Sequence, residues 1–352
     1  MCSPHKVQRQ AAGLAAILKK IIMMNKQLVD QFGRHITYLR LSVTDRCDFR
    51  CVYCMSEKMT FLPREQILTL EEQLRLSRIF ISMGVKKIRL TGGEPLIRRN
   101  IISFVEQLGA IEGLRELVLT TNGSQLRQLA QPLKKAGVQR INISLDSLQA
   151  NRFRMITRNG RLETVLEGIE AAIEAGFGRI KINTIIIKGR NDDEIIPLLL
   201  YVKEHGLDIS FIEEMPLGTN LSYDRAENYM SSVELREVIE REFQLISSPF
   251  DSGGPAEYFD LMGTDTRVGF IAPHSNNFCS SCNRVRLTSE GRLLLCLGNE
   301  NSVDLRKFLR DGYSDDDIRQ SLLNAMNIKP ERHNFDLNEK PTIVRFMNMT
   351  GG

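Results

Sequence analysis

The 352-residue sequence has no long apolar run and no large excess of charge of either sign, and its number of cysteines is odd. A membrane-spanning helix needs about 18 or more consecutive apolar residues, so we expect no segment to cross a membrane. A net charge of +4 is too small to indicate nucleic-acid binding, but it is compatible with a local basic pocket for an anion. Seven cysteines in a chain of this length argue against a disulfide framework.

The composition, 42% hydrophobic and 26% charged, excludes a disordered or collagen-like chain and predicts about two globular domains. Residues 1–24 contain an apolar stretch, but Lys19 and Lys20 interrupt it and no small-residue cleavage site follows. A secretory signal peptide is therefore not predicted. We expect a flexible N-terminal extension over residues 1–32 and a cytoplasmic location.

From residue 36 the sequence alternates short β-rich segments with longer helical patterns. The β-rich segments are 36–43, 86–91, 116–121, 140–145, 179–187 and 208–213, and the helical patterns are 70–84, 100–109, 126–137, 162–176 and 192–206. Strands that alternate with helices of this length predict consecutive βα units and a parallel sheet.

The predicted strands alternate apolar and polar side chains, whereas buried parallel strands are normally apolar on both faces. In segment 36–43, Leu39, Leu41 and Val43 face one way and Arg40 faces the other. Helices must cover the apolar face, so the polar face should line a polar cavity. This predicts an α/β fold with an incomplete (β/α)6 TIM-like barrel over residues 33–225. Half-exposed antiparallel strands are the alternative, and the helical connections argue against them.

The rhythm changes after about residue 225. A helical pattern at 233–243 is followed by a segment rich in Gly, Pro and Ser, by short β-like runs, and by two further helical patterns. We predict a smaller C-terminal region over residues 226–352 that folds against the sheet.

Three cysteines directly follow the first predicted strand with the spacing C-x3-C-x2-C; they are Cys47, Cys51 and Cys54. In βα architectures the loops at this end of the sheet carry active sites. Thiolates favour zinc or an iron–sulfur cluster. No fourth ligand lies nearby, so a 4Fe–4S cluster here would keep one iron free for a small molecule, and zinc completed by a distant residue is the alternative.

The second predicted strand ends in TGGEP, residues 91–95. Two glycines allow close approach of the backbone, and backbone carbonyls and Glu94 can accept hydrogen bonds from an amine. A GGE motif alone is a weak indication of a binding site. Together with a C-x3-C-x2-C motif one strand earlier it is a strong one.

A second triplet with the spacing C-x2-C-x13-C lies in the C-terminal region; its members are Cys279, Cys282 and Cys296. A turn at Ser289-Glu290-Gly291 predicts a hairpin that brings the third cysteine back beside the other two. Zinc with His274 or Cys2 as fourth ligand is the alternative here. The parallel with the first triplet predicts a second cluster with an open iron.

These motifs resemble the radical S-adenosylmethionine (SAM) superfamily and, within it, the MoaA-type family of GTP 3',8-cyclases. The resemblance runs from about residue 33 to the end of the chain and includes YLRLSVTDRC, IRLTGGEPL, TTNG, INISLDS, KINT, CNRVR and the terminal double glycine. Asp48, where the family often has Asn, is a departure from which we expect little effect.

The resemblance implies two 4Fe–4S clusters and SAM as cofactors and GTP as substrate. The implied reaction is a lyase step, the first of molybdenum cofactor (molybdopterin) biosynthesis. A 5'-deoxyadenosyl radical from SAM removes hydrogen from ribose C3', and attack on guanine C8 gives (8S)-3',8-cyclo-7,8-dihydroguanosine 5'-triphosphate. A downstream cyclic pyranopterin monophosphate synthase and an external electron donor are the implied partners. We expect no nucleic-acid or membrane partner, and a homodimer is one candidate assembly.

The resemblance also implies residue roles. Cys47, Cys51 and Cys54 hold the SAM cluster, and Cys279, Cys282 and Cys296 hold the cluster that meets the guanine ring. SAM contacts are Tyr53, Gly93, Ser144 and Met215; GTP contacts are Arg40, Arg89, Thr120, Lys181, Arg284 and Arg286. Arg40 is also expected to act in catalysis, together with the tail glycines Gly351 and Gly352, since double glycine can enter a cavity where side chains would clash.

The charges of these residues agree with an anionic substrate. Arg40, Arg89 and Lys181 lie on the polar face of the predicted sheet, and Arg284 and Arg286 share one face of a short strand. A charge-assisted hydrogen bond to phosphate contributes ~1.5–3 kcal/mol, so five converging cations can hold a triphosphate. The alternative for any one arginine is a surface ion pair. The rival functions are a radical SAM enzyme with another substrate, a zinc-binding interaction module and an iron–sulfur electron carrier.

Overall fold

The computed structural model describes residues 27–218, 223–336 and 343–351. One twelve-stranded sheet organises this part of the chain, in the order β12-β11-β10-β1-β2-β3-β4-β5-β6-β9-β8-β7. Its centre consists of six parallel strands, β1 (Tyr38–Ser42), β2 (Lys87–Thr91), β3 (Glu116–Thr121), β4 (Arg140–Ser144), β5 (Arg179–Ile185) and β6 (Asp208–Ile212). All six predicted strands and their parallel arrangement are confirmed.

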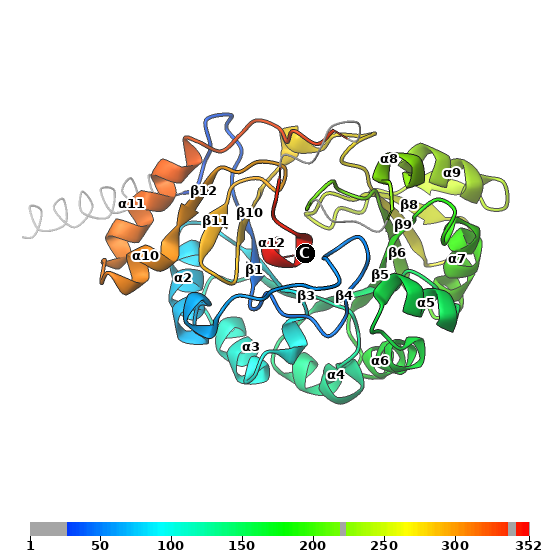
Figure 1. Cartoon of the computed structure of the whole chain (residues 1–352), viewed down its shortest axis with the longest axis horizontal. Coiled ribbons are helices and arrows are strands. Elements are labelled where there is room, and N and C mark those ends of the chain that lie inside the picture. The colour runs from blue at the N-terminus through cyan, green and yellow to red at the C-terminus, as the bar shows by residue number, and fades with distance from the viewer. Residues whose placement is uncertain (1–26, 219–222, 337–342, 352) are drawn as a thin grey trace, which may run out of the picture.

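Helices connect these strands and cover the convex side of the curved sheet (Figure 1). They are α2 (Leu70–Ser82), α3 (Ile101–Gly109), α4 (Leu126–Lys135), α5 (Ala150–Thr157), α6 (Leu162–Glu174) and α7 (Ile195–Glu204). The predicted helical patterns are confirmed, except that 192–206 opens with a 3-10 turn over Asp192–Glu194. Helix α5 was not predicted, because its eight residues carry only a short apolar stripe.

The apolar and polar faces of the sheet separate as predicted. Leu39, Leu41 and Val43 are fully buried in the core between sheet and helices, while Arg40 lines a cavity on the opposite face. Local hydrogen bonds define where the covering helix α2 begins. At the start of α2, Thr69 and Glu72 form a reciprocal capping box, which satisfies two backbone N–H groups that the helix itself cannot.

The C-terminal region adds strands to both sides of the same sheet. Strand β10 (Arg284–Leu287) pairs in parallel with β1, and β9 (Arg267–Ile271) pairs in parallel with β6. Strands β11 (Arg292–Leu294), β12 (Ser302–Asp304), β8 (Glu257–Leu261) and β7 (Leu245–Ser247) continue the sheet antiparallel. The region was expected to fold against the sheet. Its strands are instead part of it, because β10 has the same alternation of apolar and basic residues as β1.

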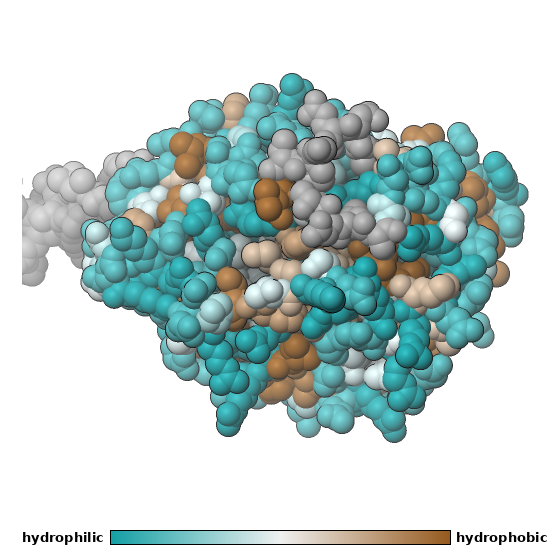
Figure 2. Space-filling model, viewed as in Figure 1, coloured by the Kyte–Doolittle hydropathy of each residue, from teal (hydrophilic) through white to brown (hydrophobic). Residues whose placement is uncertain are grey.

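The remaining helices are α8 (Arg225–Asn228), α9 (Ser232–Glu240), α10 (Leu305–Arg310), α11 (Asp315–Met326) and α12 (Met347–Thr350). The short helix α12 lies inside the crescent formed by the sheet (Figure 1). In the same view, hydrophilic residues cover most of the rim and more apolar residues gather toward the centre (Figure 2). Among the described residues, no helix has the length and apolar character needed to cross a membrane.

The N-terminal extension was predicted over 1–32, and residues 1–26 lie outside the described part of the chain. Residues 27–32 are attached to the rest of the protein at a few positions: Leu28 is buried, and Val29, itself exposed, forms a bridge with His35. Asp30 is buried too and forms an ion pair with Arg34.

Candidate active site

A cavity of about 250 Å³ lies on the polar face of the sheet. Its walls come from the polar side chains of β1 to β6 and from the loops that follow these strands. Among the residues singled out from the sequence, the lining includes Arg40, Cys47, Cys51, Tyr53, Cys54, Arg89, Gly93, Thr120, Ser144, Lys181, Met215 and Arg286. The barrel therefore brings together side chains from all six central strands or their loops, as the alternation of polar and apolar residues predicted.

The loop that carries the first cysteine triplet is held by its own turn and by α5. The N–H of Cys54 donates to the carbonyl of Cys51 at 3.0 Å. The N–H groups of Arg50 and Val52 donate to carbonyls of Thr157 and Ile156, both at 2.9 Å. Helix α5, which has no clear sequence pattern, thus supports the cysteine loop with its last turn.

Burial raises the pKa of all three thiols of this triplet, to about 12 for Cys54. Nearby carboxylates add to the effect, with Glu94 acting on Cys47 and Asp146 acting on Cys51 and Cys54. At this buried position beside carboxylates the three cysteines are thiols unless a metal binds. A metal that coordinates a thiol deprotonates it, so the thiolate form requires a bound metal.

The donor set fits an iron–sulfur cluster. The six described cysteines are all free thiols, and each triplet lines its own cavity with soft sulfur donors. Among the described residues, no three His, Cys, Asp or Glu side chains are arranged to hold a single metal ion. His274, the candidate fourth ligand for zinc, directs Nε2 to the carbonyl of Glu214 at 3.0 Å. Cys2 lies outside the described residues.

The glycines of the TGGEP motif allow two backbone segments to meet. The N–H of Gly93 donates to the carbonyl of Thr44 at 2.7 Å, beside the cysteine loop. A Cβ at Gly93 would lie 2.3 Å from the carbonyl oxygen of Arg46, a distance that no side chain tolerates. The glycines were expected to let the backbone approach a ligand. They also let the loop after β2 approach the loop that carries the first cysteine triplet.

Glu94 does not point into the cavity to accept an amine, as its place in the motif suggested. Its carboxylate accepts hydrogen bonds from the N–H groups of Leu96 and Asn122, at 2.9 and 2.7 Å, and from Oγ1 of Thr121 at 2.8 Å. Burial raises its pKa to about 8. Glu94 is thus a positioning residue that ties the end of β2 to the end of β3.

The aromatic residue between the second and third cysteines is anchored from β4. Tyr53 donates its hydroxyl proton to Oδ2 of Asp146 at 2.7 Å, and the Asp146 carboxylate also accepts from the N–H of Ile185 at 2.9 Å. Burial raises the pKa of Asp146 to about 6. Ser144, an expected SAM contact, lies two residues earlier in the same segment.

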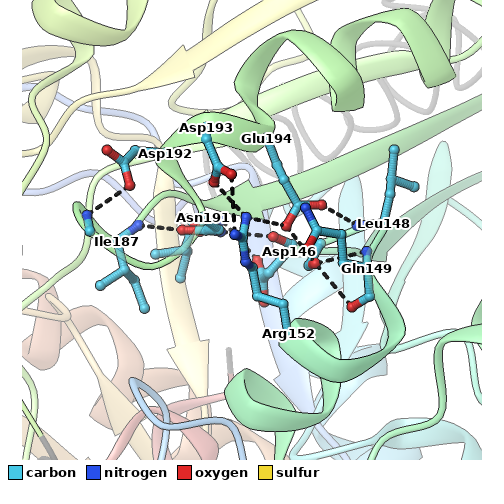
Figure 3. Close-up of polar contacts among 12 residues, drawn as sticks. Asp146, Leu148, Gln149, Arg152, Ile187, Asn191, Asp192, Asp193 and Glu194 are labelled. Atoms are coloured by element: carbon cyan, nitrogen blue, oxygen red, sulfur yellow. Dashed lines mark hydrogen bonds and ion pairs between the residues drawn. The ribbon is translucent and has the colours of Figure 1, made fainter.

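A polar network fixes this segment from behind (Figure 3). Asn191 donates Nδ2–H to the carbonyl of Asp146 at 2.7 Å and accepts from the N–H of Ile187 at 2.8 Å. Glu194 accepts from the N–H of Leu148 at 2.6 Å and pairs with Arg152 at 2.8 Å. Because these groups are buried and satisfied, the loop after β4 is held in one conformation.

Basic residues form a row across three adjacent strands. The register pairs Arg40 of β1 with Arg286 of β10 on one side and with Arg89 of β2 on the other. Burial lowers the pKa of Arg40 to about 10, and burial together with repulsion from Arg40 and Arg284 lowers the pKa of Arg286 well below its usual range. Cations held this close are preorganised to bind an anion.

Thr120 and Lys181, two further predicted GTP contacts, lie beside the row. Arg89 donates to Oγ1 of Thr120 at 3.1 Å, and Lys181 donates to the Tyr258 hydroxyl at 2.9 Å. Burial lowers the pKa of Lys181. Within the described ranges neither Arg89 nor Lys181 forms a salt bridge, although Asp208, beyond ion-pair distance, acts on the charge of Lys181.

The second triplet lines a smaller cavity of about 90 Å³. The predicted hairpin is confirmed: β10 and β11 pair antiparallel around Gly291, whose φ is +87°. Arg40, Met215 and Arg286 line this cavity as well as the larger one, so the two cavities adjoin. Arg284 lines only the smaller cavity, where its guanidinium lies 5.1 Å from the ring centre of Phe278.

The carboxyl-terminal tail reaches the site through α12. Arg40 donates to the carbonyl of Gly351 at 3.3 Å, and Asn348 donates to the carbonyl of Asp45 at 2.9 Å. Gly351 has a φ of +83°, the left-handed conformation that favours glycine. Gly352, the other tail residue expected to act in catalysis, lies outside the described residues.

Residues 41–202 match the family described as the radical SAM superfamily, and residues 207–335 match molybdenum cofactor synthesis C. A GTP 3',8-cyclase of Marinobacter nauticus is 58% identical over 331 residues, which cover 94% of this chain and 100% of that protein. One of Ectopseudomonas mendocina is 56% identical over the same shares. The chain belongs to the GTP 3',8-cyclase family.

The fold agrees with this membership. The crystal structure of Streptococcus suis SuiB bound to S-adenosylmethionine has a TM-score of 0.60 and 16% identity, covering 96% of this chain and 83% of that one. The first cysteine triplet lies inside the range that matches the radical SAM superfamily, which uses SAM with a 4Fe–4S cluster, and the second lies inside the other range. Each of the two matched ranges therefore contains one of the triplets.

Several lining residues of this family member were given no site role from the sequence. Tyr38, Lys87, Asn122, Asn142, Asp146, Asn183 and Ser252 all contribute to the larger cavity. The alternation of the strands places Tyr38, Lys87, Asn142 and Asn183 on the polar face that was expected to line a cavity, and they do line it. No local pattern singles out Ser252, which reaches the cavity from the loop between β7 and β8.

Proposed function

We propose that this protein cyclises GTP to (8S)-3',8-cyclo-7,8-dihydroguanosine 5'-triphosphate, the first step of molybdenum cofactor biosynthesis. One observation supports this more than any other: a row of buried and half-buried cations lines the adjoining cavities that hold the two cysteine triplets. A triphosphate seated on the cations would place its nucleoside between the two metal sites.

The cations would bind the triphosphate of GTP. Arg40, Arg89 and Arg286 lie next to each other across the sheet, with Lys181 and Arg284 at either side. Each charge-assisted bond to a phosphate oxygen would contribute ~1.5–3 kcal/mol, and the ligand would relieve the repulsion among the guanidinium groups. Thr120 adds a hydroxyl beside Arg89.

The second triplet would orient the base. Cys279, Cys282 and Cys296 would hold a 4Fe–4S cluster whose free iron meets the guanine ring. Phe278, His333 and Phe335 line the same cavity and would exclude water from it. Ring closure requires C3' and C8 to be held in contact, so fixing both ends of the nucleotide would contribute directly to rate.

The first triplet would hold the cluster that binds SAM, with Tyr53, Gly93, Ser144 and Met215 as contacts. SAM bound there would supply the radical chemistry needed to remove a hydrogen atom from C3' of the ribose. The protein's own part is to position and to shield. Asp146 fixes the Tyr53 hydroxyl, and Gly93 lets the loops close on the site.

Arg40 and the tail would act together at the reacting nucleotide. Arg40 lines both cavities and donates to the carbonyl of Gly351, so α12 would cover the nucleotide from the open side of the barrel. The cyclised product would pass to a cyclic pyranopterin monophosphate synthase. An external donor would supply the electrons, and a homodimer is a candidate assembly.

The test is anaerobic incubation of the iron-loaded protein with SAM, dithionite and one nucleotide at a time. We expect about eight irons per chain, since two four-iron clusters are required, and 5'-deoxyadenosine formation stimulated by GTP. A nucleotide product with the mass of GTP but a different retention time should appear, because the hydrogen lost from C3' is balanced by one electron and one proton. Stimulation by ATP or a peptide instead of GTP would overturn the proposal.

A further inference from the structure

A buried lysine adjoins the second cysteine triplet. Lys329 follows α11 and is 1% exposed. Its ammonium group donates to the carbonyl oxygens of Leu295 at 2.6 Å and Arg284 at 3.3 Å, and lies 3.8 Å from Sγ of Cys282. An ammonium group has three N–H donors and no acceptor, so these three contacts use all of it.

The charge of this lysine has no carboxylate partner among the residues that the structure describes. Burying an unpaired ammonium costs far more than burying a neutral side chain. The two carbonyl contacts compensate only part of that cost, because they are dipoles. The groups that can carry a full negative charge next to Lys329 are the sulfurs of the second triplet, of which Sγ of Cys282 lies 3.8 Å from the ammonium group.

The chain also holds Lys329 firmly in place. Arg34, itself buried, donates to the carbonyls of Pro330 and Glu331, both at 2.7 Å, and to the carbonyl of Cys279 at 2.8 Å. Asp30 pairs with Arg34 at 2.6 Å and neutralises it. The segment after Lys329 and the loop of Cys279 are therefore fastened to one guanidinium whose own charge is compensated, which leaves the charge of Lys329 for the cysteine site.

The first triplet has the opposite surroundings. Sγ of Cys47 accepts from the N–H of Phe49 at 3.4 Å and from the amide of Asn122 at 3.8 Å, Asp48 lies beside the same sulfur, and the carboxylate of Asp146 acts on the other two thiols. Arg50 reaches carbonyls of this loop. The two sites thus differ in that a basic side chain, Lys329, contacts a sulfur of the second triplet.

We propose that Lys329 is a positioning residue that balances the charge of the second iron–sulfur cluster and raises its reduction potential. The inference rests on the proposed function, which assigns a cluster to Cys279, Cys282 and Cys296. One-electron reduction adds one negative charge to a cluster held by three thiolates. A fixed cation beside a cluster ligand stabilises that charge, so the reduced state becomes more favourable.

The test compares Lys329→Met, Lys329→Gln and Lys329→Arg. Arginine keeps the charge, glutamine keeps N–H donors without charge, and methionine keeps neither. The full chain carries Cys47→Ala, Cys51→Ala and Cys54→Ala in each case, so that only the second cluster is observed. EPR-monitored redox titration gives its midpoint potential, and iron analysis gives its occupancy. Lys188→Met, at an exposed lysine paired with Glu234, is the control.

We expect the Gln and Met variants to favour the oxidised cluster by about tenfold at a fixed potential, a shift of ~59 mV for one electron, or to lose iron. The Arg variant and the control should behave like the parent. A parent-like potential in the Gln and Met variants, or an Arg variant that behaves like Met, overturns the inference. Zinc in place of iron at the second triplet of the parent defeats the proposed function instead, whatever the variants do.

Discussion

Arg89 and Tyr38, on the neighbouring strands β2 and β1, meet on the floor of the larger cavity, where Nε of the arginine donates to the tyrosine hydroxyl at 2.7 Å. Burial opposes ionisation of this tyrosine, but the positive charges of Arg89, Arg40 and Lys87 outweigh burial and lower its pKa to about 7. A tyrosinate would therefore form in the empty cavity near neutral pH and occupy the place of an anion.

The first prediction concerns pH. A bound triphosphate and a tyrosinate compete for the same cations, so GTP affinity should fall as the pH rises through about 7. Since the folded pKa of Tyr38 lies below the ordinary tyrosine pKa of 10.0, ionised Tyr38 also stabilises the empty fold at high pH, and this contribution is lost as the pH falls through about 7. Isothermal titration of GTP from pH 6 to 9 checks the effect.

Tyr38→Phe is the matched variant, because the phosphate groups of GTP titrate in the same range and both proteins share that effect. The variant should bind GTP with a flatter pH dependence above 7. An unchanged pH dependence in the Phe variant would show that the tyrosine stays protonated.

The second prediction concerns the row of arginines. Arg286→Ala should weaken GTP binding by roughly 10- to 150-fold, the loss of one charge-assisted contact of ~1.5–3 kcal/mol, and should keep the iron content unchanged. Arg127→Ala removes an equally long side chain from the surface, where it is 69% exposed, and should bind GTP like the parent. Equal affinities of the two variants would remove Arg286 from the substrate site.

These arginines also show which parts of the site could be predicted from the sequence. The alternation of residues in β1 and β2 is enough to place Arg40 and Arg89 on the polar face, since a strand with one apolar face has only one way to bury it. The pairing of β10 with β1 joins residues about 245 positions apart, as in Leu39 with Val285. Local periodicity carries no information about such a partner.

Other features were missed for different reasons. Helix α5 is short and buries only Phe153, Ile156 and Thr157, so its pattern is too weak to recognise. Glu94 was expected to face a ligand amine, but backbone N–H groups of two neighbouring loops need an acceptor and take both of its oxygens. Lys329 lies in an unpatterned segment, and only the folded chain shows what its charge faces.

The third prediction tests the contact between the TGGEP motif and the cysteine loop. Gly93→Ala places Cβ 2.3 Å from the Arg46 carbonyl oxygen, and overpacking of this kind costs ~1–3 kcal/mol. We expect a lower melting temperature and weaker SAM binding. Gly178→Ala, whose Cβ would meet no atom within 4 Å, should be neutral or slightly stabilising. SAM affinity that is the same in both variants would count against a role for this close approach.

The fourth prediction concerns the tail. A Cβ at Gly351 would lie 3.0 Å from Oγ1 of Thr91 and 3.1 Å from Cβ of Ser42, at a φ of +83°. Replacing both Gly351 and Gly352 by alanine should therefore abolish turnover while both clusters assemble. Gly312→Ala has a similar φ of +79° in open space, so it carries the same backbone strain away from the site and should remain active. Full activity of the tail variant would refute the role of the tail.

The most direct measurement follows one hydrogen atom. GTP labelled with deuterium at C3' is incubated anaerobically with the iron-loaded protein, SAM and dithionite, and the 5'-deoxyadenosine is analysed by mass spectrometry. The account predicts that the deoxyadenosine carries the deuterium and that the cyclised nucleotide has lost it. Unlabelled deoxyadenosine, formed while the nucleotide keeps its deuterium, would contradict it.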